Sequence, residues 1–182
     1  MLRFSALLLF IFLPFLSHAD ELSYQLGAGD VISISVYDEP DLSIEQVSIG
    51  LSGSISFPLL GQIQVSGLSP EQLQDELLKG LKGPYLIDPS ITVSIVEYRP
   101  FYISGEVEKP GSYPFHPGLT IDKAVSISGG FTERASKGSI YVTHDNPTGL
   151  AESDDAEPKR NNVKLFDVVR PGDVITVEQS FF

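Results

Sequence analysis

Apolar and polar residues alternate along much of the chain between residues 20 and 100, which predicts β-strands. Residues 31–36 read VISISV, with the three aliphatic residues on one face and the serines on the other. The alternation continues through residues 47–65, interrupted by glycine-containing turns, and returns at residues 91–95. We therefore expect short antiparallel strands joined by tight turns within residues 47–65, and a small mixed sheet for the unit as a whole.

A change to helical spacing follows Ser69. Ser69, Pro70 and Gln72 have the capping-box layout: serine before the helix, proline at its first position and glutamine two residues further on. Gly83-Pro84 then ends the helix. One apolar stripe is expected to pack on the sheet, and it consists of Leu73, Leu77, Leu78 and Leu81.

A joint between two units is expected at residues 97–100, because the closing proline disfavours helical geometry at the residue before it. Residues 102–107 and 113–115 then read as the two strands of a hairpin. The sequence Lys109-Pro110-Gly111-Ser112 between them is typical of a type II turn, with positive φ at the glycine.

A second helix and further strands follow the hairpin. Thr120 is placed to cap a short helix, and Gly129-Gly130 ends it in left-handed geometry. Residues 139–143 and 174–177 read as strands. Residues 145–162 are acidic and poor in apolar side chains, which predicts a solvated loop. The pattern is typical of an α+β protein with two small consecutive domains.

Two segments far apart in the chain resemble each other. Residues 26–34 (LGAGDVISI) and residues 169–177 (VRPGDVITV) both place Gly-Asp before a strand of mainly β-branched residues. We expect the side chains of Asp30 and Asp173 to accept hydrogen bonds from backbone amides in these turns. A structural repeat and a chance similarity of two common turns both explain the likeness.

The first 19 residues have the layout of a secretory signal peptide. Arg3 supplies a basic start, residues 6–16 are apolar but too short to span a bilayer, and Ser17-His18-Ala19 offers a cleavage site before Asp20. An uncleaved membrane helix is the alternative. No later segment reaches the ~20 apolar residues of a spanning helix, so we expect a secreted chain that is soluble or peripherally attached.

Composition excludes several kinds of function. The chain has 12 basic and 24 acidic residues, a formal net charge of −12, so no nucleic-acid partner is expected. It has no cysteine, and thus no disulfide, thiolate nucleophile or lipid-attachment site. His116 and His144 lie far apart in the sequence, and we expect neither a metal nor a cofactor.

Catalytic motifs are missing from the sequence. It has no nucleophile elbow, zinc-protease motif or phosphate-binding glycine loop. Asp30 and Asp38 could be drawn as the paired carboxylates of a glycosidase, and the alternative for both is a role in turns and caps. We predict no catalytic residue and no enzymatic activity.

Aromatic residues gather near the expected joint. They can pack inside the sheet of the second unit, since strands favour aromatic residues, or contact sugar rings or a neighbouring subunit. The sequence singles out no ligand-binding residue among them. The cluster consists of Tyr98, Phe101, Tyr102, Tyr113 and Phe115.

Several of these segments together resemble the outer-membrane polysaccharide export family. Residues 24–32 (YQLGAGDVI) and 53–61 (GSISFPLLG) resemble its export-and-synthesis module. Residues 104–113 (SGEVEKPGSY), 128–131 (SGGF) and 170–175 (RPGDVI) resemble its soluble-ligand-binding β-grasp (SLBB) module. The order and spacing of the segments carry the resemblance, because each motif alone is common.

The resemblance implies a domain layout and a function. Residues 20–98 are expected to form the export module and residues 99–182 the β-grasp module, with residues 145–162 as its acidic loop. The implied protein is a periplasm-facing homo-oligomer at the outer membrane. Together with an inner-membrane co-polymerase, it passes capsular or exopolysaccharide across that membrane. A periplasmic module that binds a glycan or small ligand, without a channel role, is the alternative.

Two features depart from the family pattern. Lipidated members carry a cysteine after the signal peptide, which this chain lacks, and larger members add β-grasp repeats and a C-terminal pore helix. Because the sequence ends at Phe182, we expect either a separate outer-membrane barrel protein that completes the pore or a purely periplasmic role.

Overall fold

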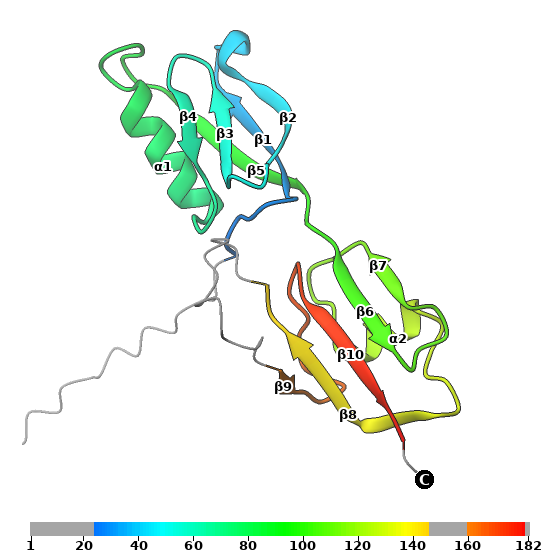
Figure 1. Cartoon of the computed structure of the whole chain (residues 1–182). Coiled ribbons are helices and arrows are strands. Elements are labelled where there is room, and N and C mark those ends of the chain that lie inside the picture. The colour runs from blue at the N-terminus through cyan, green and yellow to red at the C-terminus, as the bar shows by residue number, and fades with distance from the viewer. Residues whose placement is uncertain (1–23, 146–159, 181–182) are drawn as a thin grey trace, which may run out of the picture.

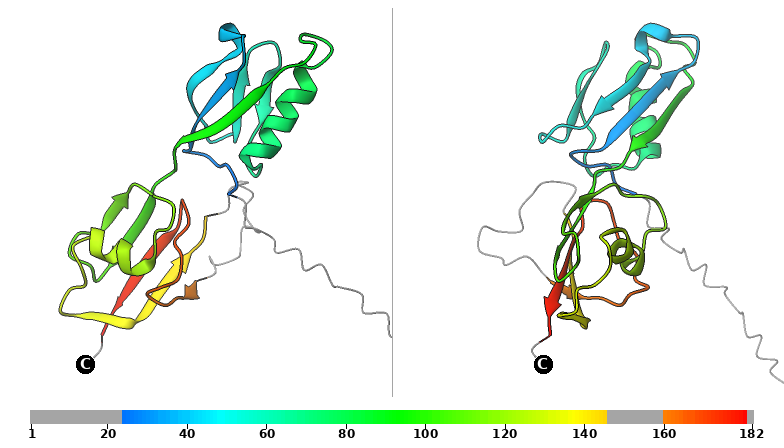
Figure 2. Two further views of the ribbon diagram at one scale, coloured as in Figure 1. Left: turned by 180° about the vertical axis from the view of Figure 1, so that it is seen from behind. Right: turned by 90° about the vertical axis from the view of Figure 1, so that its right-hand side faces the viewer.

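The computed structural model describes residues 24–145 and 160–180, which form two α+β units placed end to end (Figure 1). Each unit has its own buried cluster of hydrophobic side chains. Views from behind and from the side show the two units one after the other, linked by the chain that follows β5 (Figure 2). The predicted α+β class is confirmed. The predicted signal peptide, residues 1–19, lies outside the described residues.

The first unit contains a three-stranded sheet in the order β2-β1-β5, with a separate β3-β4 hairpin. A single turn of 3-10 helix (Pro40–Leu42) follows β1. The strands are β1 (Val31–Val36), β2 (Ile44–Ser48), β3 (Ser54–Phe57), β4 (Gly61–Gln64) and β5 (Ile91–Glu97).

The alternation predicted for residues 31–36 is confirmed, because Ile32, Ile34 and Val36 are buried while Ser35 is exposed. The expectation of a mixed sheet is wrong for this unit, since β1 pairs antiparallel with both of its neighbours. Alternation shows which face of a strand is buried, but it does not encode the direction in which the neighbouring strand runs.

Helix α1 (Pro70–Leu81) packs against β5 and carries the predicted capping box. The Ser69 hydroxyl accepts a hydrogen bond from the Gln72 amide at 3.2 Å, and the Gln72 side chain accepts one from the Ser69 amide at 2.8 Å. These two bonds satisfy amides that the start of a helix otherwise leaves without partners. The predicted stripe is confirmed, with Leu73, Leu77 and Leu81 fully buried and Leu78 partly buried.

Replacing Ser69 with alanine is expected to lower the free energy of unfolding by about 1 kcal/mol, the usual effect of losing an N-cap side chain. Urea denaturation followed by circular dichroism measures this change. The control is Ser35→Ala on the exposed face of β1, which should change stability by less than about 0.5 kcal/mol. Equal effects of the two substitutions would contradict the capping role.

The second unit is a five-stranded sheet in the order β7-β6-β10-β8-β9. The central strand, β10, runs parallel to β6 and antiparallel to β8, so this sheet is mixed. The strands are β6 (Phe101–Gly105), β7 (Gly111–Tyr113), β8 (Ala135–Thr143), β9 (Asn161–Asn162) and β10 (Val174–Gln179).

Helix α2 (Ile121–Ile127) contributes Ile121, Ala124 and Val125 to the core of this unit, as expected for a β-grasp fold. Thr120 precedes the helix as predicted, although its side chain makes no capping hydrogen bond. Gly129 and Gly130 both have positive φ after it, as predicted. The two helices of the described residues, 12 and 7 residues long, are too short to cross a membrane.

Two local predictions for the second unit are wrong. Gly111 does not occupy a type II turn with positive φ; it is extended in β7, where it pairs with Ile103. The chain leaves β6 earlier, at Gly105, which has φ of +84°. The far end of the predicted loop 145–162 forms β9, whose residues pair with the edge of β8.

Candidate functional site

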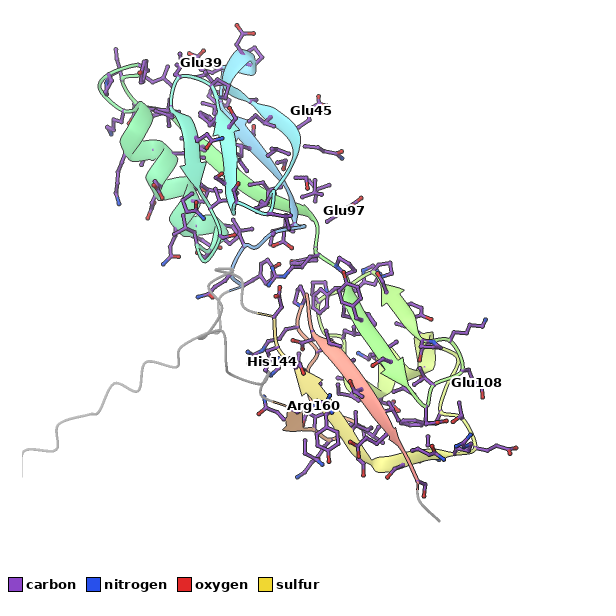
Figure 3. The ribbon with its side chains drawn as sticks, in the orientation of Figure 1. Glu39, Glu45, Glu97, Glu108, His144 and Arg160 are labelled. Carbon is purple, nitrogen blue, oxygen red and sulfur yellow. The ribbon has the colours of Figure 1, made fainter. Side chains whose placement is uncertain are left out.

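The joint between the units is built around Arg99. The chain crosses from Glu97, the last residue of β5, to Phe101, the first residue of β6 (Figure 3). Arg99 is only 7% exposed, and arginine is rarely buried without a partner. Its surroundings therefore have to supply the hydrogen bonds and opposite charge that water supplies at a surface.

Asp30, the residue before β1, is the main charge partner of Arg99. Its Oδ2 lies 3.0 Å from Arg99 Nη1, and its Oδ1 accepts a 2.8 Å hydrogen bond from the Arg99 backbone amide. Oδ2 also accepts from the Gly27 amide at 2.8 Å and from the Tyr24 hydroxyl at 2.6 Å. Asp30 is completely buried, so protein donors compensate its charge in place of water.

Tyr24 completes this network on the side of the first unit. Its hydroxyl accepts a hydrogen bond of 2.7 Å from Arg99 Nη1 and donates one to Asp30. Burial first, and the hydrogen bond to Asp30 second, raise the pKa of the Tyr24 hydroxyl well above its usual value. Tyr24 therefore remains a hydrogen-bond donor throughout the physiological pH range.

The carboxylate pair of a glycosidase is not assembled. Asp38 is exposed beyond the far end of β1, whereas Asp30 is buried before its start. The six-residue strand between them is roughly 20 Å long at ~3.3 Å per residue, while glycosidase carboxylates lie within ~10 Å of each other. Within residues 24–145 and 160–180, His, Asp and Glu side chains also form no group of three that could hold a metal ion.

The two similar sequence segments form the same turn. In the first, the Gly27 amide donates to the Asp30 carboxylate and the Asp30 amide donates to the Gly27 carbonyl. In the second, the Arg170 amide donates to the Asp173 carboxylate at 2.8 Å and the Asp173 amide donates to the Arg170 carbonyl at 3.1 Å. The prediction that both aspartates accept from backbone amides is confirmed.

Both turns close on Arg99, one from each unit. A Cβ atom added to Gly27 would lie 2.7 Å from Arg99 Nη1, and one added to Gly172 would lie 2.8 Å from Arg99 Nε. An alanine at either position would require the guanidinium to shift, and at Gly172 it would also have to adopt a φ of +84°. The Gly172 amide also donates to the Pro100 carbonyl at 3.1 Å, which fixes the second turn to the joint.

Asp173 connects the second turn to the end of β8. It is 1% exposed, and its Oδ1 lies 2.8 Å from Nδ1 of His144, at the end of β8 nearer the first unit (Figure 3). Burial raises the pKa of the Asp173 carboxyl, and the hydrogen bonds from the Arg170 amide and from His144 offset this rise in part.

We expect the stability difference between the wild type and Asp173→Asn to depend on pH. Because the pKa of Asp173 is raised on folding, the folded carboxyl holds its proton more tightly than the unfolded one. The resulting stabilisation is complete below the ordinary value of 3.8 and is lost as pH rises through the raised pKa. Urea unfolding from about pH 3 to pH 7 should show the wild type losing stability relative to the variant. A difference that stays constant with pH would contradict this expectation.

A cavity of about 810 Å³ lies beside the network, between the two units. The ring of Tyr98 contacts Tyr24 and Phe115 edge to face, with centroids 5.1 and 5.4 Å apart, so aromatic surface is continuous from one unit to the other. The aromatic lining consists of Tyr24, Tyr98, Phe115 and Phe166, and the charged lining of Arg99, Asp145, Asp167, Arg170 and Asp173.

The structure divides the aromatic cluster predicted from the sequence. Tyr98 and Phe115 line the cavity. Phe101 is completely buried and stacks on Tyr113 at 5.9 Å, so these two rings pack in the second core. Tyr102 is half exposed and does not line the cavity.

Sequence reasoning missed Tyr24 and Phe166 as cavity residues, and Arg99 as the centre of the joint. Tyr24 is the first residue of the segment 24–32 that resembles the export module, which is a weak indication of a functional role. Phe166 follows a stretch without clear periodicity and offered none.

Two family models match the chain. The model described as polysaccharide biosynthesis/export protein matches residues 18–96, and the SLBB domain model matches residues 100–150. Arg99 lies in the short segment between these two matches. The names of the matched families and relatives describe production, export and transport rather than an enzyme.

Three curated relatives illustrate the similarity. The chain is 36% identical to the exopolysaccharide production protein ExoF of Rhizobium meliloti, over 70% of the chain and 32% of the relative. It is 27% identical to the EPS I polysaccharide export outer membrane protein EpsA of Ralstonia nicotianae, over 86% and 47%. It is 26% identical to the polysialic acid transport protein KpsD of Escherichia coli, over 82% and 25%.

The chain thus spans less than half the length of each of these three relatives. The two family matches together cover most of the chain, in the order that the motifs along it predict. The chain therefore carries a polysaccharide biosynthesis/export domain followed by an SLBB domain.

Proposed function

We propose that the chain is a periplasm-facing component of a polysaccharide export channel, associated with the outer membrane, that helps to pass capsular or exopolysaccharide across it. The observation that carries this proposal is the pairing of an export domain with an SLBB domain in one chain. The names of the relatives, which describe exopolysaccharide production and polysaccharide export or transport, support it.

The proposed role involves no catalysis. The most deeply buried acid of the joint, Asp30, is occupied by four hydrogen bonds from protein donors. A general acid or base needs at least one oxygen that can reach a substrate, and such an arrangement favours a structural role for Asp30. The domain layout expected from the sequence, with residues 20–98 and 99–182 as separate modules after a signal peptide, is part of this proposal.

The proposed partners are the polysaccharide itself, further copies of this chain and an inner-membrane co-polymerase. Large side chains stand exposed on the first unit, among them Leu51 at 100% and Ile87 at 94% exposure, and such residues are available for contacts between subunits.

Deletion of the gene tests the proposed function. We expect surface polysaccharide to be lost while the polymer, or its lipid-linked precursor, is still made inside the cell. Immunoblotting of surface and cell fractions distinguishes blocked export from blocked synthesis, and re-expression of the wild-type chain serves as the control. Unchanged surface polysaccharide in the deletion strain would overturn the proposal.

A periplasmic module that binds a glycan or small ligand is the second candidate, and the cavity at the joint favours it. Native mass spectrometry of the purified protein separates the two. A ring of several copies supports the channel component. A monomer that binds oligosaccharide one to one supports the binding module, provided that export survives deletion of the gene.

A further inference from the structure

The cavity at the joint has the dimensions and position of a ligand site. Its volume of about 810 Å³ falls within the range of small-molecule sites, roughly 300–1,000 Å³. It lies between two units, which is where such sites often form. A disaccharide or trisaccharide segment is of comparable size.

The wall of the cavity exposes aromatic surface. Phe166 is 84% exposed, and it is the one exposed phenylalanine of residues 24–145 and 160–180. Val168, also in the lining, is 65% exposed. Leaving such apolar surface in water is unfavourable, and flat aromatic rings suit the C–H faces of sugar rings.

Polar groups lie within reach of the same surface. Arg99 Nε is itself buried and lies 3.2 Å from Asp145 Oδ2 at an ion-pair distance, so Asp145 holds it inside the wall. The Asp145 side chain is 46% exposed, and Arg170 is exposed on the lining. The cavity therefore offers both hydrogen-bond donors and acceptors, as hydroxyl groups require.

The charges of the lining disfavour an anionic ligand. Arg99 is already paired with Asp30 and Asp145, which leaves Arg170 as the exposed cation of the lining, where Asp167 is also exposed. Asp173 adds a further acid, held by His144. The formal charge of the whole chain, −12, acts in the same direction.

We propose that this cavity binds an uncharged saccharide segment of the exported polymer, with Phe166 as the ring against which a sugar stacks. The proposal rests on the proposed function, because it assumes that the chain meets a polysaccharide. Beyond the proposed function, it names the binding site on the chain and the class of sugar bound there, neutral rather than acidic. The walls from both units contact the ligand, so binding engages the export domain and the SLBB domain together.

Amide chemical shifts of the purified protein measure this binding. The probes are maltotetraose, cellotetraose and mannotetraose as neutral sugars and tetragalacturonate as an acidic one. We expect at least one neutral tetramer to shift amides of residues 98–99 and 166–171, with tetragalacturonate binding at least about tenfold more weakly. No shift at these residues with any neutral tetramer up to about 50 mM, or tighter binding of tetragalacturonate, would overturn the proposal.

Variants at Phe166 locate the site. Phe166→Ala should weaken binding by at least about tenfold, whereas Phe166→Tyr, which keeps a ring, should retain it. The matched control is Tyr37→Ala, because Tyr37 is also an exposed aromatic residue, at 72%, but follows β1 at the far end of the first unit. Equal weakening by the Phe166→Ala and Tyr37→Ala substitutions would overturn the assignment.

The phenotype of the deletion strain, compared with the binding data, separates failure of this site from failure of the proposed function. If deletion removes surface polymer and the Phe166→Ala protein binds sugar like wild type, the site is wrong and the export role stands. If deletion leaves surface polymer unchanged, the export role is wrong whatever the binding data show. The proposed ligand, a segment of the exported polymer, is then wrong as well.

Discussion

Substitution of Asp30 by alanine is expected to lower the free energy of unfolding of the first unit by about 3–5 kcal/mol. The change removes the buried carboxylate that pairs with Arg99 and leaves a guanidinium that is 8% exposed without its main partner. It also leaves the Gly27 and Arg99 amides without an acceptor, and each buried amide without a partner adds to the loss. Urea denaturation measures the effect.

The control for Asp30→Ala is Asp88→Ala, because Asp88 also forms an ion pair, with Lys82 at 3.1 Å. That pair is exposed to solvent, with side chains 56% and 88% exposed, so its loss should change stability by less than about 1 kcal/mol. A similar small loss in both variants would show that Arg99 finds other partners and that the joint does not depend on Asp30.

Substitution of Gly105 by alanine is expected to destabilise the second unit by about 3–5 kcal/mol. Gly105 has φ of +84°, and an added Cβ would overlap the carbonyl oxygen of Val177 in β10. Gly105 and Val177 are paired in the parallel ladder of the central strands. The backbone cannot shift there without opening that pair, so we expect faster hydrogen exchange along β6 and β10 as well as lower stability.

The control for Gly105→Ala is Gly130→Ala, which separates the effect of the overlap with Val177 from the effect of a positive φ. Gly130 lies in the same unit with φ of +97°, and an added Cβ would meet no atom within 4 Å. Its replacement should therefore show the strain alone, about 1–2 kcal/mol. If Gly130→Ala destabilised the unit as much as Gly105→Ala, the contact with Val177 would not be the cause.

Features set by neighbouring residues could be predicted from the sequence. The capping box of α1 depends on Ser69 and Gln72, which are three residues apart, and it forms as expected. The hydrogen bonds from backbone amides to Asp30 and Asp173 within their turns also span three residues. Local geometry decides these features, and local patterns therefore reveal them.

Features set by distant residues could not be predicted. Arg99 is 69 residues from Asp30 in the chain, and no spacing rule connects them. The cavity likewise depends on Phe166, which stands in a segment that shows neither period 2 nor period 3.6. Only the way in which the two units meet brings these residues together.

One wrong prediction shows how tertiary pairing overrides a turn signal. Pro110-Gly111 favours a type II turn, yet Gly111 pairs with Ile103 across the β6–β7 ladder and must be extended there. The reversal takes place between Gly105 and Pro110, where Val107 pairs with Phe131. A Pro-Gly dipeptide only favours a turn, and here the pairing of Gly111 with β6 fixes an extended backbone instead.

The position of β10 has a consequence for the order in which the chain folds. β10 is central in its sheet but is the last strand of that sheet in the chain, and Thr176 pairs with Ser104, 72 residues earlier. Closing so long a loop is slow, whereas the strands of the first unit all lie between residues 31 and 97. The turn at Gly172 and Asp173, which leads into β10, is therefore expected to close over Arg99 last. Until β10 is in place, we expect the second sheet to have unpaired edges on β6 and β8, the kind of edge that promotes aggregation.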